Sequence, residues 1–428
     1  MHHSVFRETF DQLAEILGSI RATLKLFILH QGIDIDGDCF AREIAGYPNA
    51  FRTKRARKRT IVQDGTLIDA ETGTIPYIPE ELFIELSAKP SVVKVNFVPS
   101  SPFKLILDHG HTTLVCEPLD LRLPVRLPPR AASSSLRYHD KPGDDFVQVI
   151  GADRIAILAY EGCAGWFHGT QCRFCDSCAA RPTERSARPS LNDLHTHYSN
   201  NLERWTEYEF KPYIEAVAYI YEKILKSSPP PQPHQHLHVM AGNLDDVNAE
   251  WRLIFNLSEA LAAVEALDHC DSYLNLIPPP DSILIDRAKE LGFRKLQFNM
   301  EVYGERSYAV VCSDKHAKIA FPVFMDRLKH SVAIFGKGNV RCGFVFGAQP
   351  IEELCGGVQQ LADLGVVTDY TVFTPKRGTP WEKKKRPPLH EVAAFSAFLY
   401  TIYMKYGYKP QYCALSSRSC IMNELMEE

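Results

Sequence analysis

Hydrophobic and polar positions along the chain follow two different patterns, with a change near residue 150. In the first part, an amphipathic stretch over residues 10–28 has the period of a helix. Short apolar segments follow it, at residues 60–62, 92–98, 103–107 and 112–116. Because Gly, Pro and Asp turns separate these segments, the pattern predicts a small mixed α+β domain at residues 1–140. The Pro- and Ser-rich stretch 123–138 is the predicted linker.

From residue 150 onward, short apolar runs alternate with longer stretches of helical periodicity. The apolar runs predict strands at residues 154–160, 236–241, 272–277, 295–301, 340–347 and 366–373. The stretches between and after them predict helices at residues 191–227, 248–267, 281–291, 317–333, 351–364 and 389–406. Repeated strand–helix units with right-handed crossovers form a parallel sheet that curls into a barrel. We therefore expect an α/β fold with a partial or full TIM-type (β/α) barrel at residues 150–410. A C-terminal tail, 411–428, is expected to cap it.

Composition narrows the class of protein. Of the 428 residues, 45% are hydrophobic and 23% are charged, which is typical of a globular protein. The net charge of −4 gives no indication of nucleic-acid binding, and no apolar run reaches the ~18–20 residues that a membrane span needs. The first residues lack the basic and apolar regions of a signal peptide, so we expect a cytoplasmic protein. The basic run 52–59 is interpreted as a solvated loop or an anion site.

Four of the twelve cysteines lie in one short segment, CAGWFHGTQCRFCDSC. They are spaced Cys163-x8-Cys172-x2-Cys175-x2-Cys178 and directly follow the first predicted strand of the barrel. Active sites of such barrels lie at the carboxyl ends of the strands. In a reducing compartment a dense cysteine group indicates a metal site rather than disulfides. The other cysteines are scattered and are interpreted mainly as small buried residues: Cys39, Cys116, Cys270, Cys312, Cys342, Cys355, Cys413 and Cys420.

Three kinds of site fit this spacing. Zinc binds CxxC pairs, but a structural zinc site usually takes two distant pairs, and the sequence has no CxxC outside this segment. Three thiolates suit a [4Fe–4S] cluster that keeps one iron open for substrate or cofactor. With Cys178 as a fourth ligand, the cluster would be of the electron-transfer type. The residues favour the three-ligand cluster and leave the other two sites open.

The cysteine segment resembles the radical S-adenosylmethionine (SAM) superfamily. In that family three cysteines after the first barrel strand, usually spaced CxxxCxΦC with an aromatic Φ, hold a [4Fe–4S] cluster. Cys172, Phe174 and Cys175 match the last two ligands and the aromatic residue. The usual first spacing is absent, so the resemblance assigns the first ligand to Cys163 through a longer x8 insertion. Cys178 competes for that role.

Other stretches extend the resemblance over residues 150–420. The stretch 240–243, with Gly242 and Asn243, ends the second predicted strand where the family offers its backbone to the SAM amino group. Glu301 follows the fourth strand, at the position of a ribose-binding residue. The stretch 341–347 resembles the fifth-strand element that packs on adenine, with Gly347 allowing a close backbone approach and Arg341 placed to pair with the SAM carboxylate. Together with 357–366, these stretches resemble the branch of biotin synthase, thiamine tyrosine lyase and methylornithine synthase.

The resemblance implies a radical SAM enzyme. Such an enzyme binds a [4Fe–4S] cluster and SAM, takes an electron from a flavodoxin or ferredoxin, and cleaves SAM to a 5′-deoxyadenosyl radical. The radical takes a hydrogen atom from the substrate, which we expect here to be a small molecule. Two alternatives remain: an electron-transfer Fe–S protein with Cys178 as fourth ligand, and a zinc-binding, RNA-related protein.

Polar residues around the second predicted strand are further candidates. His234, His236 and His238 share one face if the strand begins early, which would suit a metal site. Prolines beside the first two favour exposure to solvent instead. Asp245 and Asp246 follow the strand and are interpreted as carboxylates that cap the next helix.

Overall fold

The structure is a computed structural model of the 428-residue chain. It describes residues 3–36, 39, 61–63, 66–68, 81–86, 90–96, 98, 100–127, 132–150, 154–176, 187–227, 236–265, 267, 271–376, 378–410 and 419–427. Contacts divide the chain into two compact units. Unit 1 comprises residues 1–130 and 386–428, and unit 2 comprises residues 131–385.

Unit 1 begins with two helices where the sequence predicts one. They are α1 (His3–Leu17) and α2 (Ile20–Gln31). Gly18 separates them with a φ of 64°, in the left-handed region that glycine adopts readily. Ser19 then caps α2, because its hydroxyl accepts a hydrogen bond of 3.0 Å from the Ala22 N–H. The predicted single helix therefore breaks at a residue pair that is a typical C-terminus followed by an N-cap.

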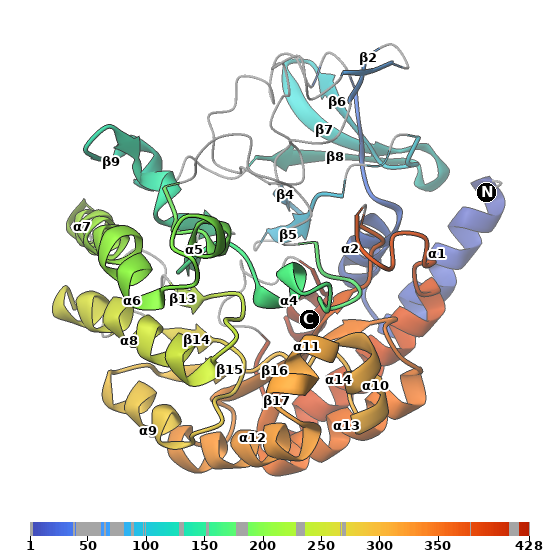
Figure 1. Cartoon of the computed structure of the whole chain (residues 1–428). Helices are drawn as coiled ribbons and strands as arrows, with labels where there is room; N and C mark the ends of the chain where they lie inside the picture. Colours follow the sequence, from blue (N-terminus) through green and yellow to red (C-terminus); the bar gives the residue numbers. More distant parts are fainter. Residues whose placement is uncertain are drawn as a thin grey trace. The chain divides into compact units, whose positions relative to one another are not determined.

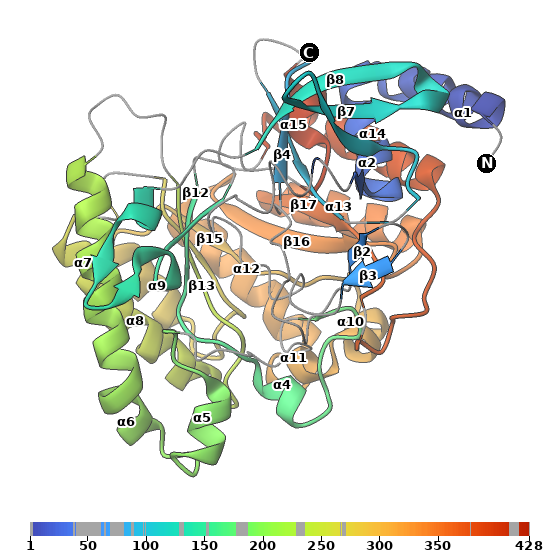
Figure 2. The same ribbon diagram turned by 90° about the horizontal axis from the view of Figure 1, so that it is seen from above.

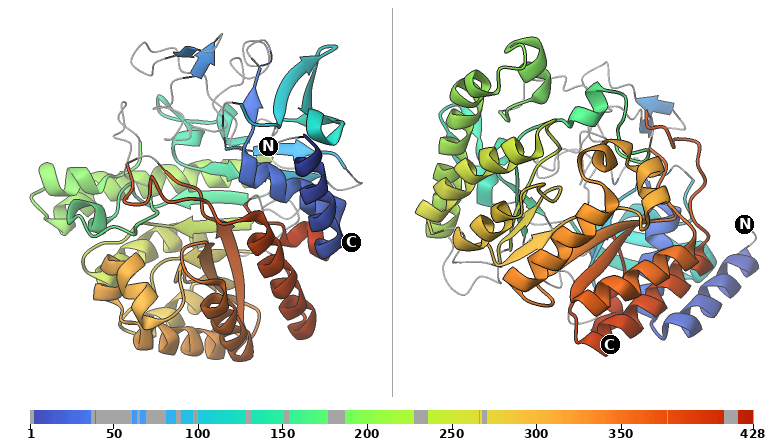
Figure 3. Two further views of the ribbon diagram at one scale, coloured as in Figure 1. Left: turned by 90° about the vertical axis from the view of Figure 1, so that its right-hand side faces the viewer. Right: turned by 60° about the horizontal axis from the view of Figure 1, so that its bottom comes forward.

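The C-terminal residues pack on these helices. Helix α14 (Leu389–Tyr406) contacts α1 and α2, and the short α15 (Met422–Met426) contacts α2 (Figure 3). The sequence assigned α14 to the barrel domain, whereas contacts place it in unit 1. A buried ion pair joins α2 to α15: Lys25 Nζ lies 2.9 Å and 3.0 Å from the carboxylate oxygens of Glu424. Each of these side chains is only 1% exposed.

The sheet of unit 1 is mixed but mostly antiparallel. Its strands are, in spatial order, β1 (Asp34–Ile35), β6 (Lys104–Asp108), β7 (His111–Cys116), β8 (Leu121–Arg126), β4 (Glu81–Ile84) and β5 (Ser91–Lys94). A separate hairpin joins β2 (Ile61–Gln63) to β3 (Thr66–Ile68). Strand β8 includes the first residues of the predicted linker, and Leu123 pairs with Leu114 of β7, so this part is not a linker. The basic run 52–59 lies outside the described residues.

Unit 2 contains the predicted parallel sheet. Its strands are β11 (Gln148–Ile150), β12 (Arg154–Leu158), β13 (His236–Met240), β14 (Tyr273–Asn275), β15 (Lys295–Gln297), β16 (Val340–Phe346) and β17 (Val366–Val372). They lie side by side in chain order, with β12 to β17 parallel and β11 antiparallel at one edge. The sheet curls as a partial barrel (Figure 2). The predicted α/β barrel class is therefore confirmed.

Helices follow the strands of unit 2. They are α4 (Ala164–Phe167), α5 (Leu191–Thr196), α6 (Leu202–Trp205), α7 (Lys211–Ser227), α8 (Val247–Ala263), α9 (Ile283–Glu290), α10 (Glu305–Val311), α11 (Ser313–Lys318), α12 (Phe321–Phe335) and α13 (Ile351–Leu364). A π-helical segment, Thr206–Phe210, connects α6 to α7. The predicted long helix over 191–227 is thus a series of shorter segments. In the part of the chain that the structure describes, no helix has the length and apolarity to cross a membrane.

One face of the sheet lies against the helices (Figure 1). The ring of Phe298, directly after β15, lies 6.1 Å from Trp251 of α8 and 6.4 Å from Phe324 of α12. Because side chains alternate along a strand, Gln297 and Asn299 point to the opposite face. We call that side the inner face. Strand register places His238, Tyr273, Asn275, Gln297, Arg341, Gly343 and Asp369 on it.

Candidate active site

The cysteine segment begins where β12 ends. Cys163 is the residue before α4, five positions after the last residue of β12. Two backbone hydrogen bonds hold this connection to the segment after β13: Ala159 N–H to the Met240 carbonyl at 2.8 Å, and Ala164 N–H to the Asn243 carbonyl at 2.7 Å. The predicted first ligand and the predicted SAM-binding stretch 240–243 therefore lie side by side.

Gly242 allows this close approach. A Cβ atom at this position would lie 1.9 Å from the Gly162 carbonyl oxygen and 3.2 Å from Cys163 Cβ. Its carbonyl accepts a hydrogen bond of 2.7 Å from the hydroxyl of the fully buried Tyr160. The sequence predicts that a backbone must approach another group closely here. The structure shows that one such group is the backbone that carries Cys163.

Glu250 supports the same turn from α8. Its Oε2 accepts a hydrogen bond of 2.6 Å from the Leu244 N–H, and the residue is fully buried. Burial raises the pKa of its carboxyl to about 8, although the bond from Leu244 opposes the shift. Burial, with the Glu250 charge beside it, also raises the pKa of Tyr160 well above its usual range. The two side chains form a buried support beneath the glycine turn.

The second half of the cysteine segment is held by a different part of the barrel. Cys172 and Cys175 flank a tight turn, in which the Cys175 N–H donates to the Cys172 carbonyl at 3.0 Å. Arg173 reaches across to the end of α10, with its backbone N–H 3.0 Å from the Val311 carbonyl and its Nε 2.8 Å from the Val310 carbonyl. The segment is thereby held at Ala164 and again at Arg173.

Helix α4, between the two halves, lies close to α11 (Figures 1 and 2). A Cβ atom on Gly165 would lie 2.9 Å from the Asp314 side chain. The Thr170 carbonyl accepts from the Asp314 N–H at 3.2 Å and from the Ser313 hydroxyl at 3.1 Å. Asp314 pairs in turn with Lys318 at 2.7 Å.

Cys163, Cys172 and Cys175 are half-buried thiols. Burial raises the pKa of Cys163 to about 11; the Asn243 backbone opposes this shift, and Cys175 and Cys172 add to it. A hydrogen bond with the Cys312 thiol, followed by burial, raises the pKa of Cys172 well above its usual range. The three thiols thus lie within electrostatic range of one another.

The residues present fit an iron–sulfur cluster in donor chemistry and in location. Thiolates are the usual ligands of such clusters, and the segment stands at the carboxyl edge of a parallel sheet. Within the described ranges, no group of at least three His, Cys, Asp or Glu side chains is arranged to hold a metal ion. Cys178 lies outside the described residues. The ligand assignment therefore remains a prediction.

Glu301 comes close to the second half of the cysteine segment. Its φ of 72° is uncommon for a residue other than glycine. Backbone bonds to β16 hold it in place: its N–H donates to the Gly343 carbonyl at 3.0 Å and its carbonyl accepts from the Val345 N–H at 2.8 Å. Lys315 Nζ lies 2.8 Å from Glu301 Oε1. Burial alone would lower the pKa of Lys315, but Glu301 and Cys172 hold it well above its usual value.

The remaining predicted SAM-binding residues lie at different distances from the carboxyl edge of the sheet. Phe174 is half-buried within the turn between the two cysteines. Gly347 follows β16 with a φ of 93°, a conformation that favours glycine. Arg341 is the second residue of β16, buried, with Nη1 4.0 Å from Asp369. Strand rise puts it about 20 Å from Gly347 along β16, so the structure does not bring Arg341 to the edge that carries the cysteines.

The polar residues around β13 differ from the sequence interpretation. His236 and His238 are buried, at 2% and 5% exposure, so the expected exposure to solvent is wrong for His236. The strand begins at His236, and both residues are on the inner face because they alternate. His234 lies outside the described residues.

Only one of the two aspartates after β13 caps a helix. Asp246 accepts a hydrogen bond of 3.0 Å from the Ala249 N–H at the start of α8, as predicted. Asp245 instead lies 2.9 Å from His168 Nε2 and 3.9 Å from Lys318 Nζ. Asp245 therefore links the cysteine segment to α11 and does not cap α8.

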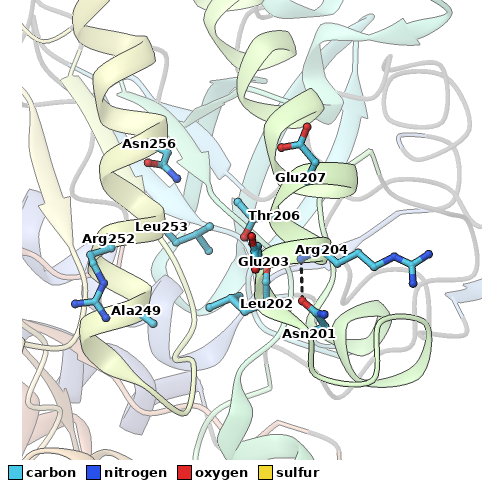
Figure 4. A pocket seen from close by; sticks show the side chains of 10 residues that line it. All are labelled: Asn201, Leu202, Glu203, Arg204, Thr206, Glu207, Ala249, Arg252, Leu253 and Asn256. Atoms are coloured by element: carbon cyan, nitrogen blue, oxygen red, sulfur yellow. Dashed lines mark hydrogen bonds between the residues drawn. The ribbon is translucent and has the colours of Figure 1, made fainter.

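A surface pocket of about 930 Å³ lies on the helical side of unit 2, between α6, the π-helical segment and α8 (Figure 4). Its lining includes Glu203, Glu207, Arg204 and Arg252, a mixture of charges. Asn201 caps α6 there, accepting a hydrogen bond of 2.9 Å from the Arg204 N–H. None of the predicted site residues lines this pocket, so it is separate from the candidate active site.

Comparison with known proteins gives one curated relative and several solved structures. No family model matches the chain. The chain is 25% identical over 143 residues to bacteriochlorophyllide c C-7(1)-hydroxylase of Chlorobaculum limnaeum. This match covers 33% of the chain and 36% of the relative. The chain thus spans little more than a third of the length of that relative.

The solved structures are similar at low identity. One is coproporphyrinogen III oxidase from Escherichia coli, described as a radical SAM enzyme, with 12% identity and a TM-score of 0.35 over 56% of this chain and 50% of that one. Another is a radical SAM methyltransferase from Sphaerobacter thermophilus, with 12% identity and a TM-score of 0.40 over 71% and 76%. Similarity at this level does not assign a superfamily, so the resemblance to radical SAM proteins and its particular branch stay predictions.

Proposed function

We propose that this chain is a radical SAM enzyme that acts on a small molecule. The observation that carries the proposal is the placement of Cys163, Cys172 and Cys175. These half-buried thiols follow the first parallel strand, on a segment held by hydrogen bonds at Ala164 and Arg173. They would hold a [4Fe–4S] cluster with one open iron. When bound, the cluster would supply the electron that cleaves SAM and so generates a radical able to take hydrogen from a C–H bond.

The chain's own contribution is to fix the cofactor-binding backbone. Gly242 and Asn243 contact the backbone on either side of Cys163. The proposed cluster ligand and the proposed SAM-binding backbone are therefore held in a fixed relation to each other. Glu301 would contact the SAM ribose, and its ion pair with Lys315 orients its carboxylate. Phe174 and Gly347 complete the proposed SAM contacts. Orientation of this kind supplies much of the rate when a reactive intermediate must meet one bond. The proposed reductant is a flavodoxin or ferredoxin.

Anaerobic reconstitution with iron and sulfide tests the proposal. After addition of dithionite and SAM, chromatography measures 5′-deoxyadenosine, and iron and sulfide are counted per chain. We expect about four irons per chain in the parent. Cys163→Ala, Cys172→Ala and Cys175→Ala should each lose the nucleoside product. Cys355→Ala is the matched control, because Cys355 is also half-buried but lies on α13.

A cluster that forms without cleaving SAM would contradict the proposal and support the electron-transfer alternative. Cys178→Ala separates these two cases. It should leave SAM cleavage intact if the cluster has three protein ligands, and abolish the cluster if it has four. Retention of zinc alone, with no iron incorporated by any variant, would reject both.

A further inference from the structure

His238 is an unusual buried side chain. It lies on β13 with 5% of its surface exposed, and neither ring nitrogen has a hydrogen-bond partner among the residues that the structure describes. Its ring stacks on Tyr273 of β14 at a centroid distance of 4.0 Å and an interplanar angle of 22°. Stacking covers a ring face and leaves the nitrogens at the ring edge. Since buried polar groups are nearly always hydrogen-bonded in native proteins, a missing partner needs an explanation.

The neighbouring side chains of the inner face do form hydrogen bonds. Gln297 Nε2 donates to Asn299 Oδ1 at 2.7 Å, and Asn299 Nδ2 donates to Asn275 Oδ1 at 3.4 Å. The Gly343 N–H also donates to Asn299 Oδ1, at 3.1 Å. These amides lie above the level of His238, and Arg341, in register with Gln297, lies on the same face 4.0 Å from Asp369. Among these inner-face side chains, His238 is one for which the described residues provide no hydrogen-bond partner.

The charge of His238 decides what it can bind. Burial holds the pKa of its imidazole well below the usual range, and the positive charge of Arg154 lowers it further. A neutral imidazole has one N–H donor and one bare nitrogen that accepts. The bare nitrogen repels the oxygens of a carboxylate or phosphate, whereas a carboxamide, lactam or hydroxyl both donates and accepts.

We propose that His238, stacked on Tyr273, is a substrate-binding residue that takes an uncharged carboxamide, lactam or hydroxyl group of the substrate. This inference rests on the proposed function, since it names the substrate class of the same barrel. It assigns the inner face of β13 and β14 to substrate and the carboxyl edge to the cofactors. The neutral imidazole itself offers an anion no ionic partner, so the expected selection against anionic analogues comes from the ring and is opposed by the nearby charge of Arg154.

Nicotinamide and nicotinate form a matched pair of probes. They share the same pyridine ring, but nicotinamide carries a neutral carboxamide and nicotinate carries a carboxylate. The full chain, without cluster or SAM, is labelled with isotopic histidine and titrated with each probe by NMR. His238→Gln, which keeps a donor and an acceptor, assigns the ring signals. We expect nicotinamide to shift the His238 signals saturably and nicotinate to bind at least tenfold more weakly, since tenfold corresponds to about one hydrogen bond.

Variants then test the residue itself. His238→Phe should weaken nicotinamide binding about tenfold, and His238→Gln should retain most of it. His330→Gln is the control, because His330 pairs with Asp286 between α12 and α9 and should not change binding. Unmoved His238 signals, or nicotinate binding as tightly as nicotinamide, would overturn the inference. The titration needs no SAM cleavage and the cleavage assay needs no substrate, so failure of one is distinguishable from failure of the other.

Discussion

Gly242→Ala tests the claim that the cysteine segment depends on one close backbone contact. The new Cβ would lie 1.9 Å from the Gly162 carbonyl oxygen, whereas ordinary contact begins at 3.4 Å. The difference is 1.5 Å, and backbone rather than a flexible side chain must move to relieve it. The connection after β12 and the turn after β13 would have to separate by about that amount.

The separation sets the expected cost. Two hydrogen bonds cross the contact at 2.7 Å, from Tyr160 to the Gly242 carbonyl and from Ala164 to the Asn243 carbonyl. An added 1.5 Å would take both beyond hydrogen-bonding distance. Two lost bonds at about 1 kcal/mol each, with about 1–3 kcal/mol of overpacking, give a destabilisation of about 3–5 kcal/mol. Cys163 would move with the displaced backbone, so iron incorporation should fall as well.

Urea unfolding of the chain without cluster, followed by circular dichroism, measures the first effect, and iron counted after reconstitution measures the second. Gly356→Ala is the control, because Gly356 lies in α13 and a Cβ there meets nothing within 4 Å. That substitution should stabilise the chain by about 0.5–1 kcal/mol through helix propensity. If Gly242→Ala binds iron and resists urea as the parent does, the close approach does not hold Cys163 and the reasoning is refuted.

Three further predictions test other parts of the structure. Gly357→Ala would place a Cβ 2.1 Å from the Tyr303 ring, so a thermal melt should show a loss of about 1–3 kcal/mol; an unchanged melt would contradict the packing. Lys25→Met should cost about 3–5 kcal/mol in urea because it leaves Glu424 buried without its cation, and adding Glu424→Leu should recover most of that loss. The raised pKa of Glu250 predicts stability that is fully present below pH 4.5 and is lost as the pH rises to about 8. Glu250→Gln should flatten this dependence, and urea midpoints between pH 5 and 9 that keep the parent slope would refute the assignment.

The parallel sheet could be predicted because its strands are continuous apolar runs. Such runs mark strands that are buried on both faces, and each one falls within a few residues of an observed strand. The bounds of α13 and α14 match the predicted ranges 351–364 and 389–406. Periodicity does not say what a helix packs against, however. The apolar residues of α14 suit a barrel as well as they suit α1, and only the tertiary contacts place α14 in unit 1.

The candidate site was predictable only where its residues form local motifs. Cys163, Cys172 and Gly242 stand in short patterns that a sequence displays. Tyr160 and Glu250 are ninety positions apart and meet only because β12 and β13 are neighbours. Burial and contacts with a few backbone groups determine which side chains fit at such positions. These constraints produce no recognisable motif in the sequence.

The long spacing between Cys163 and Cys172 has a structural reason. Its residues form α4 and a turn, closed by the Thr170 N–H bond to the Gly165 carbonyl at 2.7 Å. The first residue of α4, Ala164, donates its N–H to the Asn243 carbonyl. The next residue, Gly165, lies so close to the Asp314 side chain that a larger residue would not fit. A three-residue spacing would remove both contacts. The intervening residues therefore tie the cysteines to the segment after β13 on one side and to α11 on the other, which would account for the long spacing if the proposed ligand assignment holds.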